Sequence, residues 1–405
     1  MLISPDRALR IVLSRVRPPA GAFRVPLLAA LGRRLAEDVR SDRDQPPTDR
    51  SAMDGYAVIS ADLRAPPRRL RPVGEAAAGG AARICVRAGS CAAILTGASV
   101  PPGADAVVPV EQTRREGDWV TFLSPSRRGD NVRRRGEEAA RGQVLLPKGT
   151  LLGPAQIAVC AMVGKAALRV RRGPKVAVIC TGEELREPGG PISPHQIRDS
   201  NGPMLLAALA AHGLPGAERR IVKDDPAAIA SRLRADLRKC QVVIVTGGVS
   251  VGRYDFVPEA VRRAGGRVRF HGVNMKPGRP QLYATVGAGR HVFALPGNPV
   301  SVMTGLHELV LPALRRLCGA ARADCRPAAR LPLAGAVRSN GKRTVFALAR
   351  LVETARGARA APVASAGSAD IIAACAADGV IVVPEGTRHI AAGCIVEFHP
   401  WKPET

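Results

Sequence analysis

The chain has 405 residues, of which 46% are apolar, and its formal net charge is +26. This length allows two to four domains, each able to bury its own core. No apolar run of about 18 residues occurs, so the sequence predicts a soluble protein with no membrane span. The nine cysteines are scattered without a C-x-x-C pair, which argues against a disulfide framework or a zinc knuckle and favours the cytoplasm.

The high positive charge raises the question of nucleic-acid binding. Aromatic residues make up only 3% of the chain, so few side chains could stack on single-stranded bases. Basic pairs such as Arg68–Arg69 and Arg315–Arg316 are dispersed rather than clustered. We therefore expect no nucleic-acid partner, and we expect the charge to attract small anionic substrates.

The chain begins with a predicted amphipathic helix. Ser4 is expected to be its N-cap, Pro5 occupies the first helical position, and Pro18 would stop it. No convincing signal-peptide cleavage site follows. Residues 19–172 are rich in Gly, Pro and short apolar runs, a pattern typical of short strands joined by turns.

From about residue 173 the pattern changes to strands that alternate with helices, and after Arg326 it returns to β. The predicted strands are residues 175–182, 241–248, 267–273, 281–286 and 291–297, and the predicted helices are residues 202–213, 224–239, 257–266 and 301–317. Such alternation predicts a doubly wound, mostly parallel sheet. The last 80 or so residues suffice for a small β-domain.

Four loops with polar or Gly-rich sequences are expected at one edge of this sheet. They are "CTGEEL" (180–185), "TGGVSVGRYD" (246–255), "MKPGRP" (275–280) and "LPGNPVS" (295–301). Ligands of doubly wound sheets bind beyond the carboxyl ends of the strands. Backbone N–H groups, two carboxylates and a cation together predict a pocket for a phosphorylated ligand with Mg²⁺, which takes oxygen ligands.

Two residues of these loops have competing interpretations. Asp255 is either the N-cap of the following helix or a metal-binding or catalytic carboxylate. Lys276 is one of only eight lysines among 60 basic residues. A lysine beside Pro277 and Gly278 favours a compact positive charge for a phosphate group.

Six motifs, in order along almost the whole chain, carry a family resemblance. They are the last three loops above together with "PPTDRSAMDGYAV" (46–58), "LTGASVPPGADAVVPVEQ" (95–112) and "GDNVRRRGEEAARGQVLLPKGTLLGPAQI" (129–157). The chain resembles the molybdopterin molybdenumtransferase family, the group of MoeA and the gephyrin E-domain. The resemblance implies an Mg²⁺-assisted transferase that inserts molybdate into adenylylated molybdopterin and releases AMP.

The resemblance also assigns the site residues. The catalytic set implied is Asp54, Thr96, Glu138, Glu184, Asp224, Asp255 and Lys276, of which Asp54, Glu184 and Asp255 are the implied metal ligands. The implied ligand-binding set is Gly247, Gly248, Ser250, Gly252, Pro277, Gly278, Arg279, Pro296, Gly297, Asn298, Pro299, Ser301 and Ser368. Glu138 and Arg279 stand where the family commonly has Asp and Lys, so neither departure removes a charge.

The resemblance implies an α/β plus β fold with four domains. A doubly wound three-layer α/β domain, residues 173–322, would be combined with N-terminal β-rich domains and a barrel-like C-terminal β-domain, residues 323–405. The linking domain would comprise residues 1–45 and 135–172, and the inserted β-rich domain residues 46–134. Residues 1–18 would form a helix that packs on the α/β domain.

A homodimer is implied as well, with the active site between one chain's α/β domain and the partner's N-terminal β-rich domain. The molybdopterin adenylyltransferase and recipient molybdoenzymes are further implied partners. Three alternatives remain: an enzyme of the related adenylyltransferase type, a non-catalytic scaffold or binding protein on the same fold, and a nucleic-acid-binding protein. The domains outside the α/β region argue against the first, and the intact acidic and lysine positions against the second.

Overall fold

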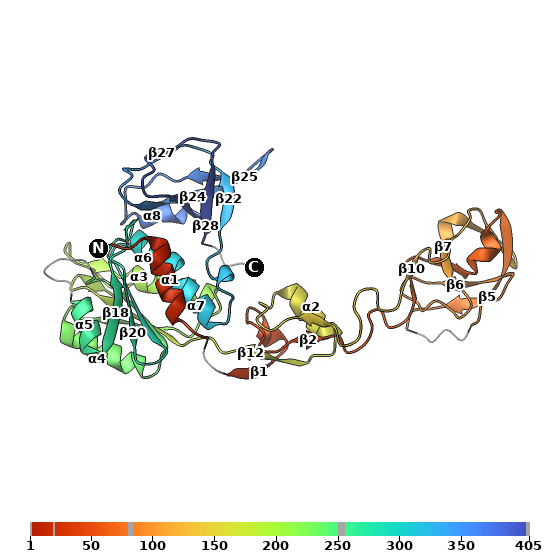
Figure 1. Cartoon of the computed structure of the whole chain (residues 1–405), viewed down its shortest axis with the longest axis horizontal. Helices are drawn as coiled ribbons and strands as arrows, with labels where there is room; N and C mark the ends of the chain where they lie inside the picture. The colour runs from red at the N-terminus through yellow and green to blue at the C-terminus, as the bar shows by residue number, and fades with distance from the viewer. Residues whose placement is uncertain (1, 19–20, 80–83, 250–255, 402–405) are drawn as a thin grey trace. The chain divides into compact units, whose positions relative to one another are not determined.

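The computed structural model describes residues 2–18, 21–79, 84–249 and 256–401 (Figure 1). The chain divides into two compact units. The first unit comprises Met1–Ala36, Gly149–Gly153 and Ala167–Thr405, and the second comprises Glu37–Lys148 and Pro154–Ala166. This division combines parts of several predicted domains, so the four domain boundaries stay a prediction.

The first unit contains a six-stranded sheet in the order β16-β13-β17-β21-β20-β18. Its strands are β13 (Val176–Thr181), β16 (Glu218–Val222), β17 (Val242–Thr246), β18 (Gly266–His271), β20 (Leu282–Val286) and β21 (Arg290–Leu295). The first four in spatial order are parallel, which confirms the predicted mostly parallel sheet. Strand β20 is antiparallel to both neighbours, because the short turn between β20 and β21 leaves no room for a crossover.

Helices cover both faces of this sheet, which confirms the predicted three layers. The helices are α1 (Pro5–Arg15), α3 (Asn201–Ala211), α4 (Pro226–Leu237), α5 (Val257–Arg263), α6 (Pro299–Gly305), the π-helical segment η4 (Leu306–Val310) and α7 (Leu311–Leu317). Helices α1, α3, α6 and α7 share one core with Val178 and Ile244, and α4 and α5 share the other with Ile179 and Val245. Successive strand residues thus point to opposite faces, and both faces are buried.

The two predicted N-cap residues that the structure describes, Ser4 and Asp225, are confirmed, whereas the helix predicted from residue 301 begins at Pro299. The Ser4 hydroxyl accepts a hydrogen bond from the Arg7 backbone N–H at 3.3 Å, and the Asp225 carboxylate accepts one from Ala228 at 2.7 Å. Each side chain satisfies a backbone donor that the first helical turn leaves unpaired. The N-cap position of α5 is Phe256, and Asp255 lies outside the described residues.

The C-terminal part of the first unit is a small β-domain, as predicted. Its main sheet has the order β19-β24-β26-β28-β22, with β25 paired to β24. The strands are β19 (Met275–Lys276), β22 (Ala329–Pro332), β24 (Thr344–Thr354), β25 (Gly357–Pro362), β26 (Gly379–Val383) and β28 (Ile395–Pro400). A core that includes Ile381 and Phe398 lies beneath it. Strand β19 belongs by sequence to the α/β region, so it ties the Lys276 loop to the C-terminal sheet.

Short elements complete the first unit. They are β1 (Ala22–Pro26), which pairs with β12 (Ala167–Arg171), β14 (Leu185–Arg186) with β15 (Ile197–Arg198), β23 (Val337–Arg338) with β27 (His389–Ile390), and helix α8 (Ile371–Cys375).

The second unit is rich in β-structure, as its short apolar runs predicted. A six-stranded sheet has the order β7-β4-β6-β5-β9-β8. Its strands are β4 (Gly55–Val58), β5 (Arg68–Ala76), β6 (Ser90–Ile94), β7 (Ala106–Pro109), β8 (Thr113–Glu116) and β9 (Trp119–Phe122). Tyr56 and Phe122 pack edge to face in its core, with ring centroids 5.9 Å apart.

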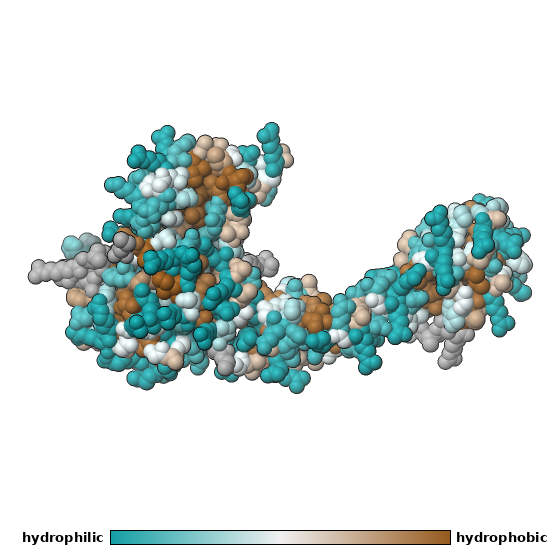
Figure 2. Space-filling view, in the orientation of Figure 1, coloured by the Kyte–Doolittle hydropathy of each residue, from teal (hydrophilic) through white to brown (hydrophobic). Residues whose placement is uncertain are grey.

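The second unit also contains smaller elements. They are β2 (Val39–Arg40), which pairs with β11 (Val144–Leu146), β3 (Arg50–Ser51), which pairs with β10 (Val132–Arg133), and helix α2 (Pro154–Met162). Hydrophilic residues cover most of the face shown in Figure 2. Within the described ranges, none of the helices combines the length and apolarity needed to cross a bilayer.

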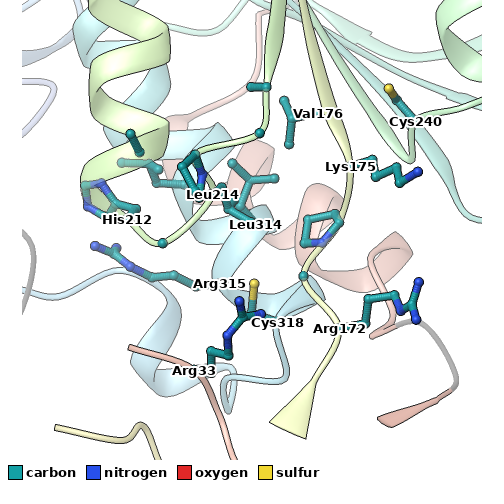
Figure 3. Close-up of a pocket in the computed structure, with 18 of the residues that line it drawn as sticks. Arg33, Arg172, Lys175, Val176, His212, Leu214, Cys240, Leu314, Arg315 and Cys318 are labelled. Carbon is teal, nitrogen blue, oxygen red and sulfur yellow. The ribbon is translucent and has the colours of Figure 1, made fainter. Parts of the chain in front are cut away.

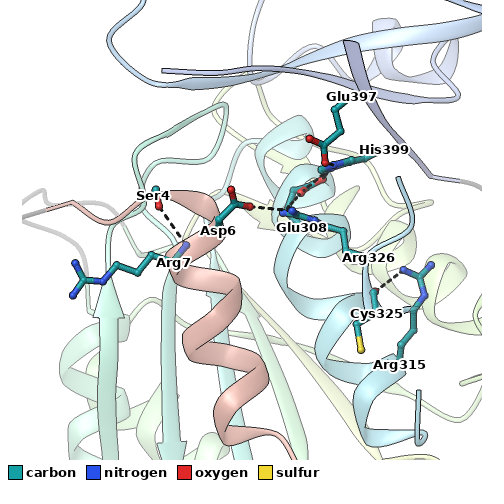
Figure 4. A network of polar contacts seen from close by, with 9 residues as sticks. All are labelled: Ser4, Asp6, Arg7, Glu308, Arg315, Cys325, Arg326, Glu397 and His399. Carbon is teal, nitrogen blue, oxygen red and sulfur yellow. Dashed lines mark hydrogen bonds and ion pairs between the residues drawn. The ribbon is translucent and has the colours of Figure 1, made fainter. Parts of the chain in front are cut away.

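A polar network with a buried centre holds helix α1, segment η4 and strand β28 together (Figure 4). Glu308 of η4 is 1% exposed, and its carboxylate lies 2.9 Å from Nδ1 of His399 and 3.4 Å from Arg326. Arg326 also contacts Asp6 at 2.9 Å, and Nε2 of His399 lies 2.8 Å from Glu397. Burial alone would lower the pKa of His399, but the hydrogen bonds to Glu308 and Glu397 outweigh it and raise this pKa.

The raised pKa of His399 predicts how stability depends on pH. Its contribution to the free energy of unfolding is fully present below the unfolded-state pKa, near 6.5, and is lost as pH rises through the folded-state pKa. Urea unfolding between about pH 5 and pH 9 should therefore show a smaller difference between the parent and His399→Gln at the alkaline end.

Two other buried histidines do not disturb this comparison. Burial lowers the pKa of His291 to about 4 and that of His307 to about 3. Their contributions are lost as pH falls below about 6.5, equally in both proteins, and cancel in the difference. Parallel stability curves for parent and variant would contradict the assignment of a charged His399.

Candidate active site

Loops that follow the strands of the α/β sheet meet at its carboxyl edge. Strands β13, β16, β17 and β21 are parallel and in register, with Thr181 beside Val222 and Thr246 beside Leu295. The loops that begin at Gly182, Gly247 and Pro296 therefore leave the sheet side by side, as the sequence predicted.

Gly247 occupies a position that only glycine fits. Its φ is +96°, and an added Cβ would lie 2.0 Å from the backbone oxygen of Thr181. Its N–H donates to the Leu295 oxygen at 3.2 Å, so this donor already has a partner within the protein. At Gly248 an added Cβ would lie 3.1 Å from the Asp224 carboxylate. The glycines therefore allow the loop to pass close to β13 and to Asp224.

Replacing Gly247 with Ala should destabilise the protein. The new Cβ would meet backbone atoms that cannot move independently, and the positive φ would strain any L-residue. We expect the free energy of unfolding to fall by about 2 kcal/mol or more, measured by urea unfolding. Gly287→Ala is the control, because Gly287 also has a positive φ, +53°, but no atom lies within 4 Å of its added Cβ. A loss no larger than the control's would contradict this role.

Two predicted carboxylates lie at this edge of the sheet. Asp224 is half-buried, and its carboxylate accepts a hydrogen bond from the Thr181 hydroxyl at 2.9 Å. Glu184 is exposed and folds back over Gly182, whose added Cβ would lie 2.8 Å from a carboxylate oxygen. The predicted residues Ser250, Gly252 and Asp255 lie outside the described part of the chain.

A cavity of about 660 Å³ lies beside the Pro296 loop and the Lys276 loop, between the α/β sheet and the C-terminal sheet. Its only charged lining residues, among those the structure describes, are Lys276, Arg279 and Arg343. None of the three forms an ion pair with a described carboxylate. The cavity is also lined by the predicted residues Pro277, Gly278, Pro296, Gly297, Asn298, Ser301 and Ser368. Its charge suits an anionic ligand such as a phosphate ester.

Asn298 and Ser368 connect the two sides of this cavity. The Asn298 amide donates to the Ser368 hydroxyl at 2.7 Å, and the Ser368 carbonyl accepts from the Val300 backbone N–H at 3.0 Å. Pro299 begins helix α6 beside them. Ser368 thus lies beside the Pro296 loop, with which the family resemblance had grouped it.

Sequence reasoning missed Asn201 and Arg343. The Asn201 amide donates to the Gly297 carbonyl at 2.7 Å and to the Thr246 hydroxyl at 3.2 Å, so it joins two loops of the edge. In the sequence it precedes Gly202 and is indistinguishable from an ordinary helix-capping residue. Arg343 lies just before strand β24, and its only sequence signal is a basic pair with Lys342.

The second unit contains the remaining predicted residues. One Asp54 carboxylate oxygen accepts hydrogen bonds from the Thr96 hydroxyl at 2.7 Å and from the Thr96 backbone N–H at 2.6 Å. These two bonds, the hydroxyl first, lower the pKa of Asp54. Thr96 therefore holds an exposed, ionised carboxylate in one orientation. Glu138 forms an ion pair with Arg133, which also contacts Glu137 at 3.3 Å.

Three family models match successive parts of the chain. They are the MoeA N-terminal region (domain I and II) at residues 3–164, a probable molybdopterin binding domain at residues 177–316, and the MoeA C-terminal region (domain IV) at residues 330–401. A molybdopterin molybdenumtransferase from Staphylococcus aureus is 34% identical over 393 residues, which cover 96% of this chain and 93% of that relative.

The chain belongs to the molybdopterin molybdenumtransferase family. A relative with the same name from a Nostoc species is 38% identical over 304 residues, 74% of this chain and 70% of that protein. A solved moeA protein from Pyrococcus horikoshii superposes with a TM-score of 0.83 at 29% identity, over 99% of this chain and all of that one. The family and the fold class predicted from the sequence are confirmed.

Membership of the molybdopterin molybdenumtransferase family does not by itself identify which residues bind a metal ion. Among the described residues, no three His, Cys, Asp or Glu side chains are grouped as metal ligands. The three predicted ligands are distributed over the second unit (Asp54), the sheet edge (Glu184) and a position outside the described residues (Asp255). Their role stays a prediction.

Proposed function

We propose that this protein inserts molybdate into adenylylated molybdopterin and releases AMP. The observation that carries this proposal is the cavity between the two sheets of the first unit. Among the described residues its charged lining is entirely basic, and two of the motif loops, residues 275–280 and 295–301, contribute to its wall. The reaction is proposed from the name of the relatives, and the cavity is the proposed binding site of the phosphorylated substrate.

Lys276 is the residue proposed to bind the phosphate oxygens. Its ammonium group is exposed at the cavity and its backbone is held by the pairing of β19 with β24. Arg279 and Arg343 add further positive charge. Phosphoanhydride cleavage places growing negative charge on the leaving AMP, and fixed cations stabilise such charge without reorganisation.

Asn298 and Ser368 are proposed to position the substrate. Their mutual hydrogen bond fixes the orientation of both side chains at the junction of the two sheets. The Ser368 hydroxyl can still donate its proton to a substrate oxygen, since it accepts from Asn298. Ser301 lines the same cavity and is 3% exposed.

Mg²⁺ is proposed as a cofactor because the available donors are hard carboxylate oxygens. Glu184 fits this role, since its exposed carboxylate forms no ion pair among the described residues. Together with Asp54 and Asp255 it would hold the ion, which when bound would neutralise phosphate oxygens. Asp224, held by Thr181, would position groups at the same edge of the sheet.

A homodimer is proposed in which Asp54 and Thr96 of one chain complete the site of the other. Cytoplasmic location is proposed from the nine cysteines, none of which forms a disulfide. The molybdopterin adenylyltransferase would supply the adenylylated substrate, and molybdoenzymes would receive the product.

An AMP-release assay tests the proposed reaction. Purified protein is incubated with adenylylated molybdopterin, and AMP is quantified by chromatography. We expect release only when molybdate and Mg²⁺ are both present. Release that is unchanged when both are omitted would remove the proposed function.

A further inference from the structure

A second cavity, of about 720 Å³, lies in the first unit at the opposite edge of the α/β sheet (Figure 3). It is lined by residues that begin β13 and β16 and by the last turns of α3, α4 and α7. It shares no lining residue with the Lys276 cavity. The proposed reaction therefore leaves this cavity without a role.

The interior of this amino-edge cavity is apolar. Leu311, Leu314 and Val176 line it and are 1%, 2% and 4% exposed. Burial raises the pKa of the Cys318 thiol to about 11, so this lining group is neutral at physiological pH. Cavities of roughly 300–1,000 Å³ with such walls enclose small organic molecules. The space suits an apolar molecular body and not merely a single ion.

The rim is strongly basic. Eight basic residues and two acidic ones line the cavity. Both carboxylates are already neutralised by arginines, Asp236 by Arg232 at 2.9 Å and Glu218 by Arg220 at 3.2 Å. The excess positive charge is therefore not compensated by these two acidic side chains.

Two arginines at the rim are held in place with no carboxylate partner among the described residues. Arg33 and Arg172 lie over the Phe23 ring, with guanidinium carbons 5.3 Å and 5.4 Å from its centroid. Nε of Arg171 is buried and has no hydrogen-bond partner among the described residues. Stacking on Phe23 orients two guanidinium groups, and Nε of Arg33 also donates to the Ala29 carbonyl at 3.0 Å. The terminal nitrogens of both guanidinium groups can still donate to an anion.

The negative ends of the helix dipoles do not cancel the positive charge of the rim. Three helices direct their carboxyl ends at the cavity, and each carries about half a negative charge there. Their combined charge of about −1.5 is much smaller than the excess of basic over acidic lining residues. The rim therefore stays positive after the negative charge of the three helix ends is subtracted.

We propose that the amino-edge cavity binds a small organic anion, a molecule in which a carboxylate, sulfonate or phosphate group is joined to an apolar body. The apolar body lies against Leu311 and Leu314. The anionic group lies at the rim beside Arg33 and Arg172. This site is separate from the site of the proposed transferase reaction and does not depend on it.

The test uses 1-anilinonaphthalene-8-sulfonate as the probe and the uncharged N-phenyl-1-naphthylamine as its comparison, both followed by fluorescence. The charge variant is Arg33→Gln with Arg172→Gln. The filling variant is Ala210→Trp, at an exposed position of α3 that lines the cavity. The matched control removes two exposed arginines of β8 in the second unit, Arg114→Gln with Arg115→Gln.

We expect the parent and the control to bind the sulfonate with the same affinity. Binding should be at least tenfold weaker in the charge variant and should lose one site per chain in the filling variant. The uncharged probe should bind the parent more weakly than the sulfonate does. Circular dichroism melting checks that each variant is folded. Arg33 and Arg172 are exposed, so the charge variant still tests the proposal if Ala210→Trp does not fold.

Three results would overturn the proposal. Equal sulfonate binding by parent and charge variant would show that the rim does not recognise anions. Equal binding of the charged and uncharged probes would show the same. The third result combines two observations: the parent has no sulfonate site, and sedimentation shows that Ala210→Trp dissociates an oligomer of the parent. The cavity would then be a subunit interface.

Discussion

Lys276→Ala should lower kcat/KM for molybdate-dependent AMP release by about 100- to 1,000-fold, the usual effect of removing one fixed donor to developing negative charge. The structure predicts a large effect because Lys276 is one of three charged residues that line the cavity within the described part of the chain. Its side chain is exposed, so the melting temperature should change by about 2 °C or less. Steady-state kinetics and differential scanning calorimetry measure the two quantities.

Lys148→Ala is the matched control for this substitution. Lys148 is also exposed and is absent from the lining of the cavity. The control should keep parental kinetics. Parental kinetics in Lys276→Ala, or a loss of activity that follows a lowered melting temperature, would contradict the assignment of Lys276 to the phosphate.

Mixing inactive Asp54→Ala chains with inactive Lys276→Ala chains should restore activity. In the proposed dimer, one site of each mixed dimer combines an intact second unit with an intact Lys276 cavity. Random pairing makes about half of the dimers mixed, and each mixed dimer has one intact site out of two. The activity of the mixture should therefore approach about a quarter of the parent's activity. Mass spectrometry verifies the exchange of chains.

The hydrogen bond between Thr96 and Asp54 provides a negative control for this experiment. Both residues belong to the second unit and act as a pair. A mixture of Asp54→Ala and Thr96→Ala chains would therefore contain no intact site and should stay inactive. No recovery in the first mixture would place Asp54 and Lys276 in the same chain's site or show that Asp54 is not catalytic.

Local patterns in the sequence predicted the elements that carry the site. Continuous apolar runs marked the strands buried on both faces, and Ser4 and Asp225 marked helix starts through their own side-chain hydrogen bonds. Because parallel strands end at a common edge, the order of strands and helices also predicted that the Gly182 and Gly247 loops converge. These features depend on residues close in sequence or on a general rule of topology.

Contacts between distant segments could not be predicted in this way. The Asn298–Ser368 hydrogen bond joins residues 70 positions apart, and only the family resemblance grouped them. Nothing in the sequence around Met275 indicated that β19 would pair with β24 of the C-terminal sheet. Asn201 was missed because its two acceptors, the Thr246 hydroxyl at the end of β17 and the Gly297 carbonyl in the loop before α6, lie 45 and 96 positions away. Such contacts depend on how distant segments of the chain pack, which periodicity does not encode.

The amino-edge cavity had no sequence signal either. Arg33 and Arg172 are 139 residues apart and meet only because β1 pairs with β12 and brings both to Phe23. In a chain with a net charge of +26, single arginines do not stand out. Their importance appears only when the absence of a carboxylate partner among the described residues is seen together with the apolar space beside them.

The central claim is that AMP release is coupled to molybdate insertion at the Lys276 cavity. The most direct measurement is the amount of molybdenum bound to molybdopterin for each AMP released, by elemental mass spectrometry and chromatography of one reaction. The account predicts one molybdenum atom per AMP throughout the reaction. AMP released without molybdenum incorporation would instead identify a hydrolase and contradict the account.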